Sequence, residues 1–82
     1  SCGEDYEREL AAYVSAQEDV VRVDLLHSRM FGNRTYIDME LQVDGELPLR
    51  EAHAIAERIH DSVEARFSDV KHITIHLNPA LR

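Results

Sequence analysis

Carboxylate and imidazole side chains recur at alternating positions in three segments of the chain. Asp24 belongs to the first segment, Asp38 and Glu40 to the second, and His72 and His76 to the third. Side chains of these types bind divalent metals in proteins. If the segments are neighbouring strands about 4.8 Å apart, such side chains can converge on one ion. A polar face that only contacts solvent would have the same composition, and alternation does not distinguish the two.

The helical histidines give a weaker signal. His53 and His60 are seven residues apart in a segment with helical periodicity, and Glu57 lies between them on the same side. A location on the helix surface explains this spacing as well as metal binding does. On a strand, His72 and His76 share a face but lie about 13 Å apart, so they cannot bind one ion together.

Three strands must position these groups. Residues 20–30 and 35–43 alternate apolar and polar side chains around the turn 31–34, which predicts a hairpin, and His27 close to that turn is expected to be exposed. Residues 70–77 form a third strand, which Asn78-Pro79 is expected to stop. The apolar side of the strands is expected to comprise Val21, Val23, Leu25, Ile37, Met39, Leu41, Ile73, Ile75 and Leu77. The opposite side then carries Asp24, Leu26, Asp38, Glu40, His72 and His76.

Two amphipathic segments, residues 4–16 and 49–67, have apolar side chains at helical spacing. The predicted order is therefore helix, strand, strand, helix, strand. A right-handed crossover through the second helix places both helices on one face of a three-stranded sheet. The fold class is α+β, a ferredoxin-like α-β-β-α-β sandwich, whose other sheet face is open.

Length and composition narrow the possible functions. The 82 residues form one domain, 1–82, small enough that dimerisation or a bound metal would be needed to stabilise it further. The net charge of −7 disfavours nucleic acid as a partner. No apolar run approaches the roughly 20 residues that a membrane span needs. Cys2 is the single cysteine, which excludes an internal disulfide.

Other functions of this topology fit less well. A copper chaperone needs a Cys-x-x-Cys loop, which one cysteine cannot supply. No serine has the setting of a hydrolase nucleophile. A small phosphatase or ligand sensor would need an anion site at Asn33-Arg34, and turn formation explains both residues more simply. These observations argue against an enzyme.

Three motifs in order resemble the C-terminal domain of cation diffusion facilitators, a family of membrane exporters of divalent metals. They are RMFGNRTYIDM at residues 29–39, VDGELPLREAHAIA at 43–56 and ITIHLNP at 73–79. The resemblance covers about residues 5 to 80. It implies a ferredoxin-like, metallochaperone-like domain on the cytoplasmic side of a bacterial cell membrane. It also implies a V-shaped homodimer below the transmembrane domain of a parent transporter, with no small-molecule substrate.

The resemblance also implies a metal site between the two protomers, and metal binding there is expected to favour transport. Carried over by position, its ligands are Asp24, Glu40, His53, His76 and Asn78. Zinc-handling members often have histidine at the first two positions and aspartate at the last. The carboxylates make this set harder, which favours Mn²⁺ or Fe²⁺ over Zn²⁺ without excluding it. The alternative is a structural dimerisation module that binds no metal.

Overall fold

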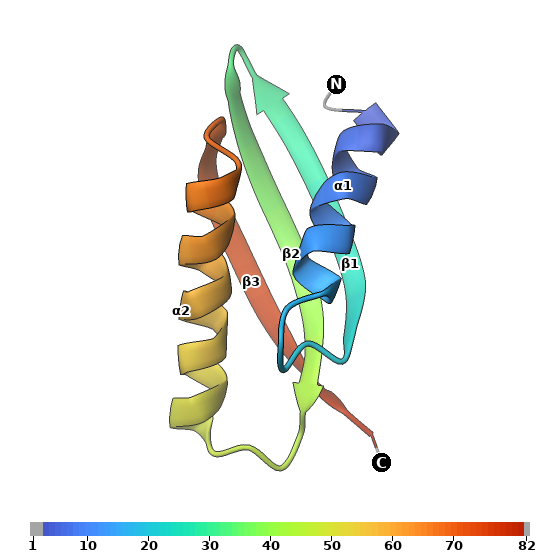
Figure 1. The fold of residues 1–82 in the computed structure, drawn as a ribbon, viewed down its shortest axis with the longest axis vertical. Coiled ribbons are helices and arrows are strands. Elements are labelled where there is room, and N and C mark those ends of the chain that lie inside the picture. Colours follow the sequence, from blue (N-terminus) through green and yellow to red (C-terminus); the bar gives the residue numbers. More distant parts are fainter. Residues whose placement is uncertain (1–2, 82) are drawn as a thin grey trace.

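The computed structural model describes residues 3–81, which form two helices and three strands (Figure 1). In chain order the elements are α1 (Gly3–Ser15), β1 (Arg22–Phe31), β2 (Arg34–Asp44), α2 (Leu49–Arg66) and β3 (Val70–Ala80). This order confirms the predicted α-β-β-α-β fold. Cys2 lies outside the described residues. Within the described part of the chain, neither helix combines the length and apolar character needed to cross a membrane.

The strands form one sheet in the order β1-β2-β3, with β2 in the centre (Figure 1). β1 and β2 are antiparallel and are joined at Gly32-Asn33, where Gly32 has a φ of 63°. Glycine adopts this left-handed conformation without the steric cost that a side chain would add. β2 and β3 are parallel, and α2 connects them. β1 and β3 are therefore both edge strands.

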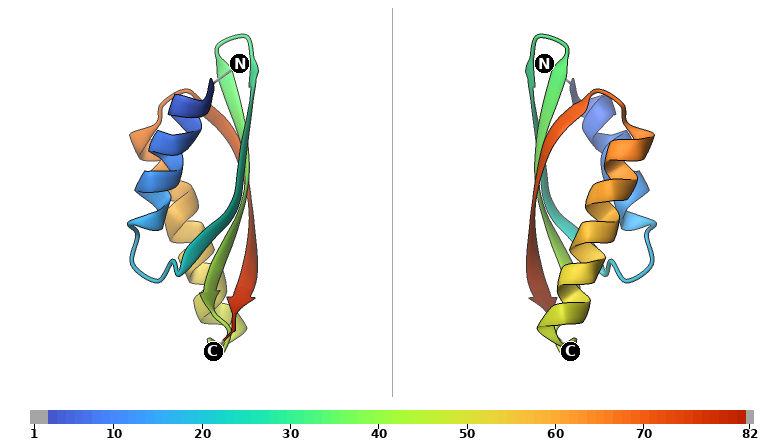
Figure 2. Two further views of the ribbon diagram at one scale, coloured as in Figure 1. Left: turned by 90° about the vertical axis from the view of Figure 1, so that its right-hand side faces the viewer. Right: turned by 90° about the vertical axis from the view of Figure 1, so that its left-hand side faces the viewer.

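Both helices cover the same face of the sheet, as predicted (Figure 2). Each presents a buried stripe at four-residue spacing, Leu10 and Val14 on α1 and Ile55, Ile59 and Val63 on α2. Alternate residues of β2 meet these stripes, which makes the central strand the middle of the core. The buried apolar residues are Leu10, Val14, Ile37, Met39, Leu41, Val43, Ile55, Ile59, Val63, Phe67 and Ile73. Neither of the two described helices covers the other face, which is called the open face below.

A β-bulge at Asp24 changes the face on which the following residues of β1 lie. Val23 and Leu25 pair with consecutive residues of β2, so Asp24 is an extra residue in the ladder. Leu25 consequently lies on the open face and is 45 % exposed, whereas Leu26 packs against the core. The sequence-based assignment of these two leucines was therefore wrong, because simple alternation assumes that no residue is inserted. Val21, also expected to face the helices, precedes β1 and is exposed.

β3 continues beyond its predicted stop. Pro79 and Ala80 pair with Val43 and Asp44 of β2. The prediction that Asn78-Pro79 ends the strand was wrong, because an edge strand tolerates proline where no partner needs its missing N–H. The extra length keeps Asn78 inside the sheet, with its side chain on the open face.

Hydrogen bonds hold the start of α1 against the sheet. Ser28 of β1 donates from its backbone nitrogen and from Oγ to Glu7 Oε2, at 2.8 and 2.6 Å. The hydroxyl and then the backbone donor of Ser28 lower the pKa of Glu7, an effect that partial burial opposes. Tyr6 donates to Asp69 Oδ2 at 3.0 Å, and the buried Thr35 donates to the same oxygen at 2.6 Å. These contacts connect α1 to β1 and to the segment that enters β3.

Candidate metal site on the open face of the sheet

The open face carries most of the polar side chains that the sequence predicts there. From β2 it receives Tyr36, Asp38, Glu40 and Gln42, and from β3 His72, Thr74, His76 and Asn78. The prediction is thus confirmed for both strands, because neither has a bulge between these residues. On β1 the bulge adds Leu25 and His27 to this face, where His27 pairs with Asp38.

Four polar residues are linked at one end of the open face. Asn78 Nδ2 donates to Asp24 Oδ2 at 3.1 Å and to Glu40 Oε1 at 3.2 Å. Gln42 Nε2 donates to the two carboxylate oxygens of Asp24 at 2.8 and 3.1 Å. Arg22 Nε lies 3.3 Å from Asp24 Oδ1, and the side chain of Asp24 is 23 % exposed. Two carboxylates from different strands are therefore held together by amide donors.

His76 lies next to this cluster. It is the register partner of Glu40 in the parallel β2–β3 ladder, and it is exposed. Strand neighbours are about 4.8 Å apart, so an imidazole there can reach an ion that also contacts the Glu40 carboxylate. The structure thus places four of the five predicted ligands on one face. Hydrogen bonds join Asp24, Glu40 and Asn78, and His76 is the backbone register partner of Glu40.

His53 does not join them within one chain. It lies on α2, in the layer that covers the other face of the sheet, and its Nε2 is 2.6 Å from Glu57 Oε1. Its side chain is 70 % exposed, so it is free to meet a partner outside its own chain. A site that uses His53 together with the open-face residues needs a second copy.

The cluster has the ligand types for a divalent cation, and its two carboxylates are joined by hydrogen bonds from Asn78. Carboxylate and imidazole ligands suit Mn²⁺, Fe²⁺ and Zn²⁺. The amide nitrogen of Asn78 donates to both carboxylates. A cation at the same place would attract the same two groups. A half-turn of that amide would replace the donor by its oxygen, which is a ligand for hard cations.

The sequence interpretation missed two contributors to this face. Gln42 is two residues after Glu40 and therefore shares its face, but alternation gives no sign that its amide donates to Asp24. His27 was expected to be exposed near the turn, and it is exposed, but its pairing with Asp38 follows from the bulge. Arg29 Nη2 also lies 3.8 Å from Asp38 Oδ2, so this second carboxylate is partly balanced by a cation.

Comparison with known proteins assigns the domain. The family model "Cation efflux protein, cytoplasmic domain" matches residues 2–80. The manganese efflux system protein MneP of Bacillus subtilis is 32 % identical over 71 residues, which are 87 % of this chain and 24 % of that protein. The chain therefore spans about a quarter of the length of this relative.

Solved structures have the same fold. A structure of the putative zinc transporter CzrB aligns with a TM-score of 0.89 at 22 % identity, covering 99 % of this chain and 100 % of that one. The nickel form of an Asp-to-Asn variant of the MamM C-terminal domain aligns with a TM-score of 0.90 at 19 % identity, covering 96 % and 100 %. The α-β-β-α-β architecture and the match along almost its whole length make this chain a member of the family of cytoplasmic domains of cation efflux proteins.

Proposed function

We propose that this chain is a regulatory domain of a divalent-cation efflux transporter, located on the cytoplasmic side of a bacterial membrane. Two copies form a homodimer, and metal bound between them favours transport by the membrane-spanning part of the parent protein. The ligands are Asp24, Glu40, His53, His76 and, after rotation of its amide, Asn78. Membership of the cation efflux family supports the role, and the similarity to a manganese efflux protein supports a divalent cation as the ligand.

The observation that carries the proposal is the amide bridge between two carboxylates. Asn78 Nδ2 lies within 3.2 Å of carboxylate oxygens of both Asp24 and Glu40. The positive end of one amide dipole therefore already holds the two carboxylates together. A cation at that position gains the same attraction at full charge. His76 beside Glu40 adds an imidazole, and the harder carboxylate ligands favour Mn²⁺ or Fe²⁺ over Zn²⁺.

Charge and ligand placement support a metal site shared by two copies. Each chain has a net charge of −7, so two open faces that approach each other repel unless a cation lies between them. His53 lies outside the open face of its own chain, so a site that includes it is completed by the partner. In a two-fold dimer each copy would supply the same residues to the interface.

Calorimetric titration of the metal-stripped chain with Mn²⁺ and with Zn²⁺ at neutral pH tests the proposal. We expect saturable binding, together with compaction of the dimer in small-angle scattering. Asp24→Asn and His76→Ala should each weaken binding at least tenfold and leave the circular dichroism spectrum unchanged. Glu51→Gln is the matched control, since it removes one exposed carboxylate from the first turn of α2. Binding that is equally tight in His76→Ala would contradict the assignment of His76.

A second candidate function is a dimerisation module that binds no metal. The observation that favours it is the same cluster, because Gln42 and Asn78 already supply hydrogen-bond donors to the two carboxylates. This alternative predicts an unchanged melting temperature with any divalent ion. The metal-binding proposal predicts a melting temperature that rises with ion concentration.

A further inference from the structure

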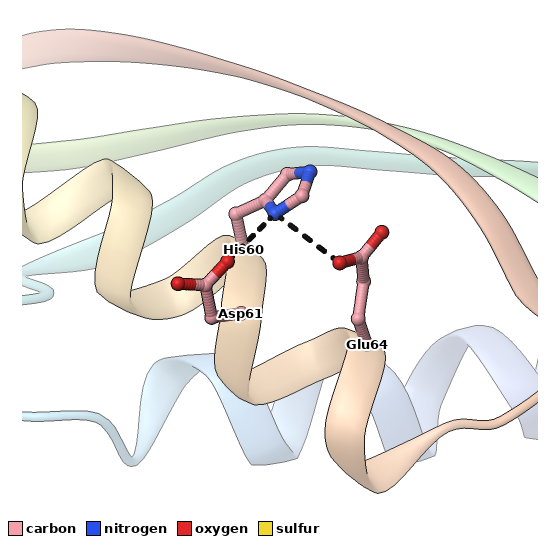
Figure 3. Close-up of side chains that lie close together, drawn as sticks. All are labelled: His60, Asp61 and Glu64. Carbon is pink, nitrogen blue, oxygen red and sulfur yellow. Dashed lines mark hydrogen bonds and ion pairs between the residues drawn. The ribbon is translucent and has the colours of Figure 1, made fainter.

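A second group of metal-ligating side chains lies on α2, away from the open face (Figure 3). His60 Nδ1 is 3.3 Å from Asp61 Oδ1 and 3.6 Å from Glu64 Oε1. One ligand atom from each of the three side chains lies within 4.8 Å of the others. All three residues come from one helix and one chain. The group, called the helix triad below, is therefore complete without a partner.

The distances in the helix triad lie in the ion-pair range and are longer than a short charge-assisted hydrogen bond. Charge-assisted hydrogen bonds are about 2.7–2.9 Å long, and an imidazole Nδ1 has one hydrogen to donate. Here one nitrogen faces two oxygens, both beyond that range. Ligand atoms about 2.1 Å from a tetrahedral metal lie about 3.4 Å from each other, which matches both separations.

The same helix offers a direct comparison. His53 and Glu57 have the same four-residue spacing as His60 and Glu64, but their closest atoms are 2.6 Å apart. That pair is a close ion pair between one nitrogen and one oxygen. In the helix triad the distance from His60 Nδ1 to Glu64 Oε1 is 1.0 Å longer, and the Asp61 carboxylate faces the same nitrogen.

The His60 imidazole lies at the edge of a recess. His60 is 38 % exposed and lines a recess of about 140 Å³ between α2 and β3, together with Ala56, Glu57, Ile73 and Ile75. The two isoleucines line the same recess, and one helix carries all three candidate ligands. Glu64 also lies in the last turn of α2, where the helix dipole favours positive charge.

We propose that His60, Asp61 and Glu64 form a second divalent-cation site, with water in the remaining coordination positions. One imidazole and two carboxylates select a first-row cation such as Zn²⁺ or Mn²⁺ over Mg²⁺ or Ca²⁺, which prefer oxygen ligands alone. The site acts within one chain, so its occupancy is independent of dimerisation. It does not rest on the open-face proposal, because the two groups share no residue.

Imidazole-resolved nitrogen-15 NMR during Zn²⁺ titration of the 82-residue chain tests the two sites separately. His60 reports the helix triad, and His76 reports the open face. We expect a saturable change at His60 Nδ1 that persists when the protein is diluted tenfold. Asp61→Asn combined with Glu64→Gln should weaken that response at least tenfold. Glu51→Gln, which removes a carboxylate from the other end of the same helix, should leave it unchanged.

Two results would overturn the helix triad. In the first, excess Zn²⁺ leaves the His60 ring unchanged, whether or not His76 responds; a response at His76 alone leaves the open-face proposal intact. In the second, the His60 response is as strong without Asp61 and Glu64 carboxylates as with them, which would mean that a lone surface imidazole binds the ion. Because all three side chains are at least partly exposed, the substitutions are compatible with the fold.

Discussion

The side-chain nitrogen of Asn78 lies 3.1 Å from Oδ2 of Asp24, although β1 and β3 are opposite edges of the sheet. Backbones of strands two positions apart are separated by about 9.6 Å, so both side chains must extend over β2. Gln42, on β2 between them, donates to the same carboxylate at 2.8 Å. Side chains thus connect the two edge strands over the central one at the end that carries the proposed metal ligands.

Asn78→Asp should lower the stability of the chain without metal and raise its affinity for metal. The substitution removes the donor shared by Asp24 and Glu40 and adds a third carboxylate beside them. We expect the free energy of unfolding without metal to fall by about 1 kcal/mol at neutral pH, because hydrogen bonds are lost and like charges are brought together. Added Mn²⁺ or Zn²⁺ should then raise the melting temperature more than in the parent chain.

Asn78→Ala separates the two effects of that substitution. It removes the amide donor without adding a ligand, so it should lower stability less than Asn78→Asp and should gain no metal response. Thermal unfolding with and without metal measures both variants. If Asn78→Asp matches the parent in stability and in metal response, the amide bridge has no role in metal binding.

Deletion of Asp24 should remove the bulge and keep the fold. Val23 and Leu25 would then be adjacent, and their partners Leu41 and Glu40 are already adjacent, so the antiparallel ladder becomes regular. We expect a melting temperature within a few degrees of the parent and metal binding weakened at least tenfold, because one carboxylate is lost from the open face. Amide NMR and calorimetry would measure the two properties. Metal binding that survives the deletion would exclude Asp24 as a ligand.

The bulge also explains the limit of the sequence-based prediction on β1. Hydrophobic alternation predicted the faces of β2 and β3 correctly, because their pairing is regular from the pair Tyr36/His72 to the pair Leu41/Leu77. A single inserted residue reverses the faces beyond it, and the pattern of Val23, Leu25 and Leu26 is apolar under either register. Only pairing with Leu41 and Glu40 distinguishes the two, and that information comes from another strand.

Ser28→Ala should destabilise the chain in a pH-dependent manner. Ser28 lowers the pKa of Glu7 below its ordinary value of 4.5, so the contact stabilises the fold above that pH and is lost as the pH falls through the lowered value. We expect a loss of about 1 kcal/mol at neutral pH, for the missing hydroxyl, and a smaller difference from the parent in acid. Chemical unfolding across the acid range measures this.

Ser15→Ala is the control for that experiment. The Ser15 hydroxyl donates to the backbone carbonyl of Ala12, which does not titrate, so its effect should be constant with pH. If the stability difference between Ser28→Ala and the parent is also constant with pH, the Ser28 hydroxyl does not lower the pKa of Glu7.

Thr35→Val should raise the pKa of Asp69. Burial alone raises the pKa of this carboxyl, but hydrogen bonds from Thr35, from its own backbone and from Tyr6 lower it below its ordinary value of 3.8. Valine keeps the shape of the buried threonine and removes the hydroxyl donor. We expect about 1–3 kcal/mol lower stability at neutral pH. Carbon-13 NMR titration of Asp69 measures the pKa, and an unchanged value would contradict the assigned role of Thr35.

For the candidate sites, the sequence predicted which residues share a face more readily than which side chains bind one another. Asp24, Glu40 and His76 could be assigned to one face, because alternation and strand spacing determine which side chains are neighbours. The hydrogen bonds from Asn78 to Asp24 and Glu40 depend on side-chain rotamers, which alternation along a strand does not predict. His60 was recognised as a helical histidine, but its group with Asp61 and Glu64 depends on rotamers and on the wall formed by β3.

The two interruptions at this end of the sheet restrict how copies of the chain can associate. Asp24 interrupts the ladder of the edge strand β1 beside Glu40 and Leu41 of β2. Pro79 lacks a donor on the edge strand β3 and lies beside Val43. Bulges and prolines at strand edges hinder the addition of another strand, which is a common route to aggregation. Edge-to-edge association is therefore disfavoured where the carboxylates gather, which agrees with the proposed dimer in which the open faces meet.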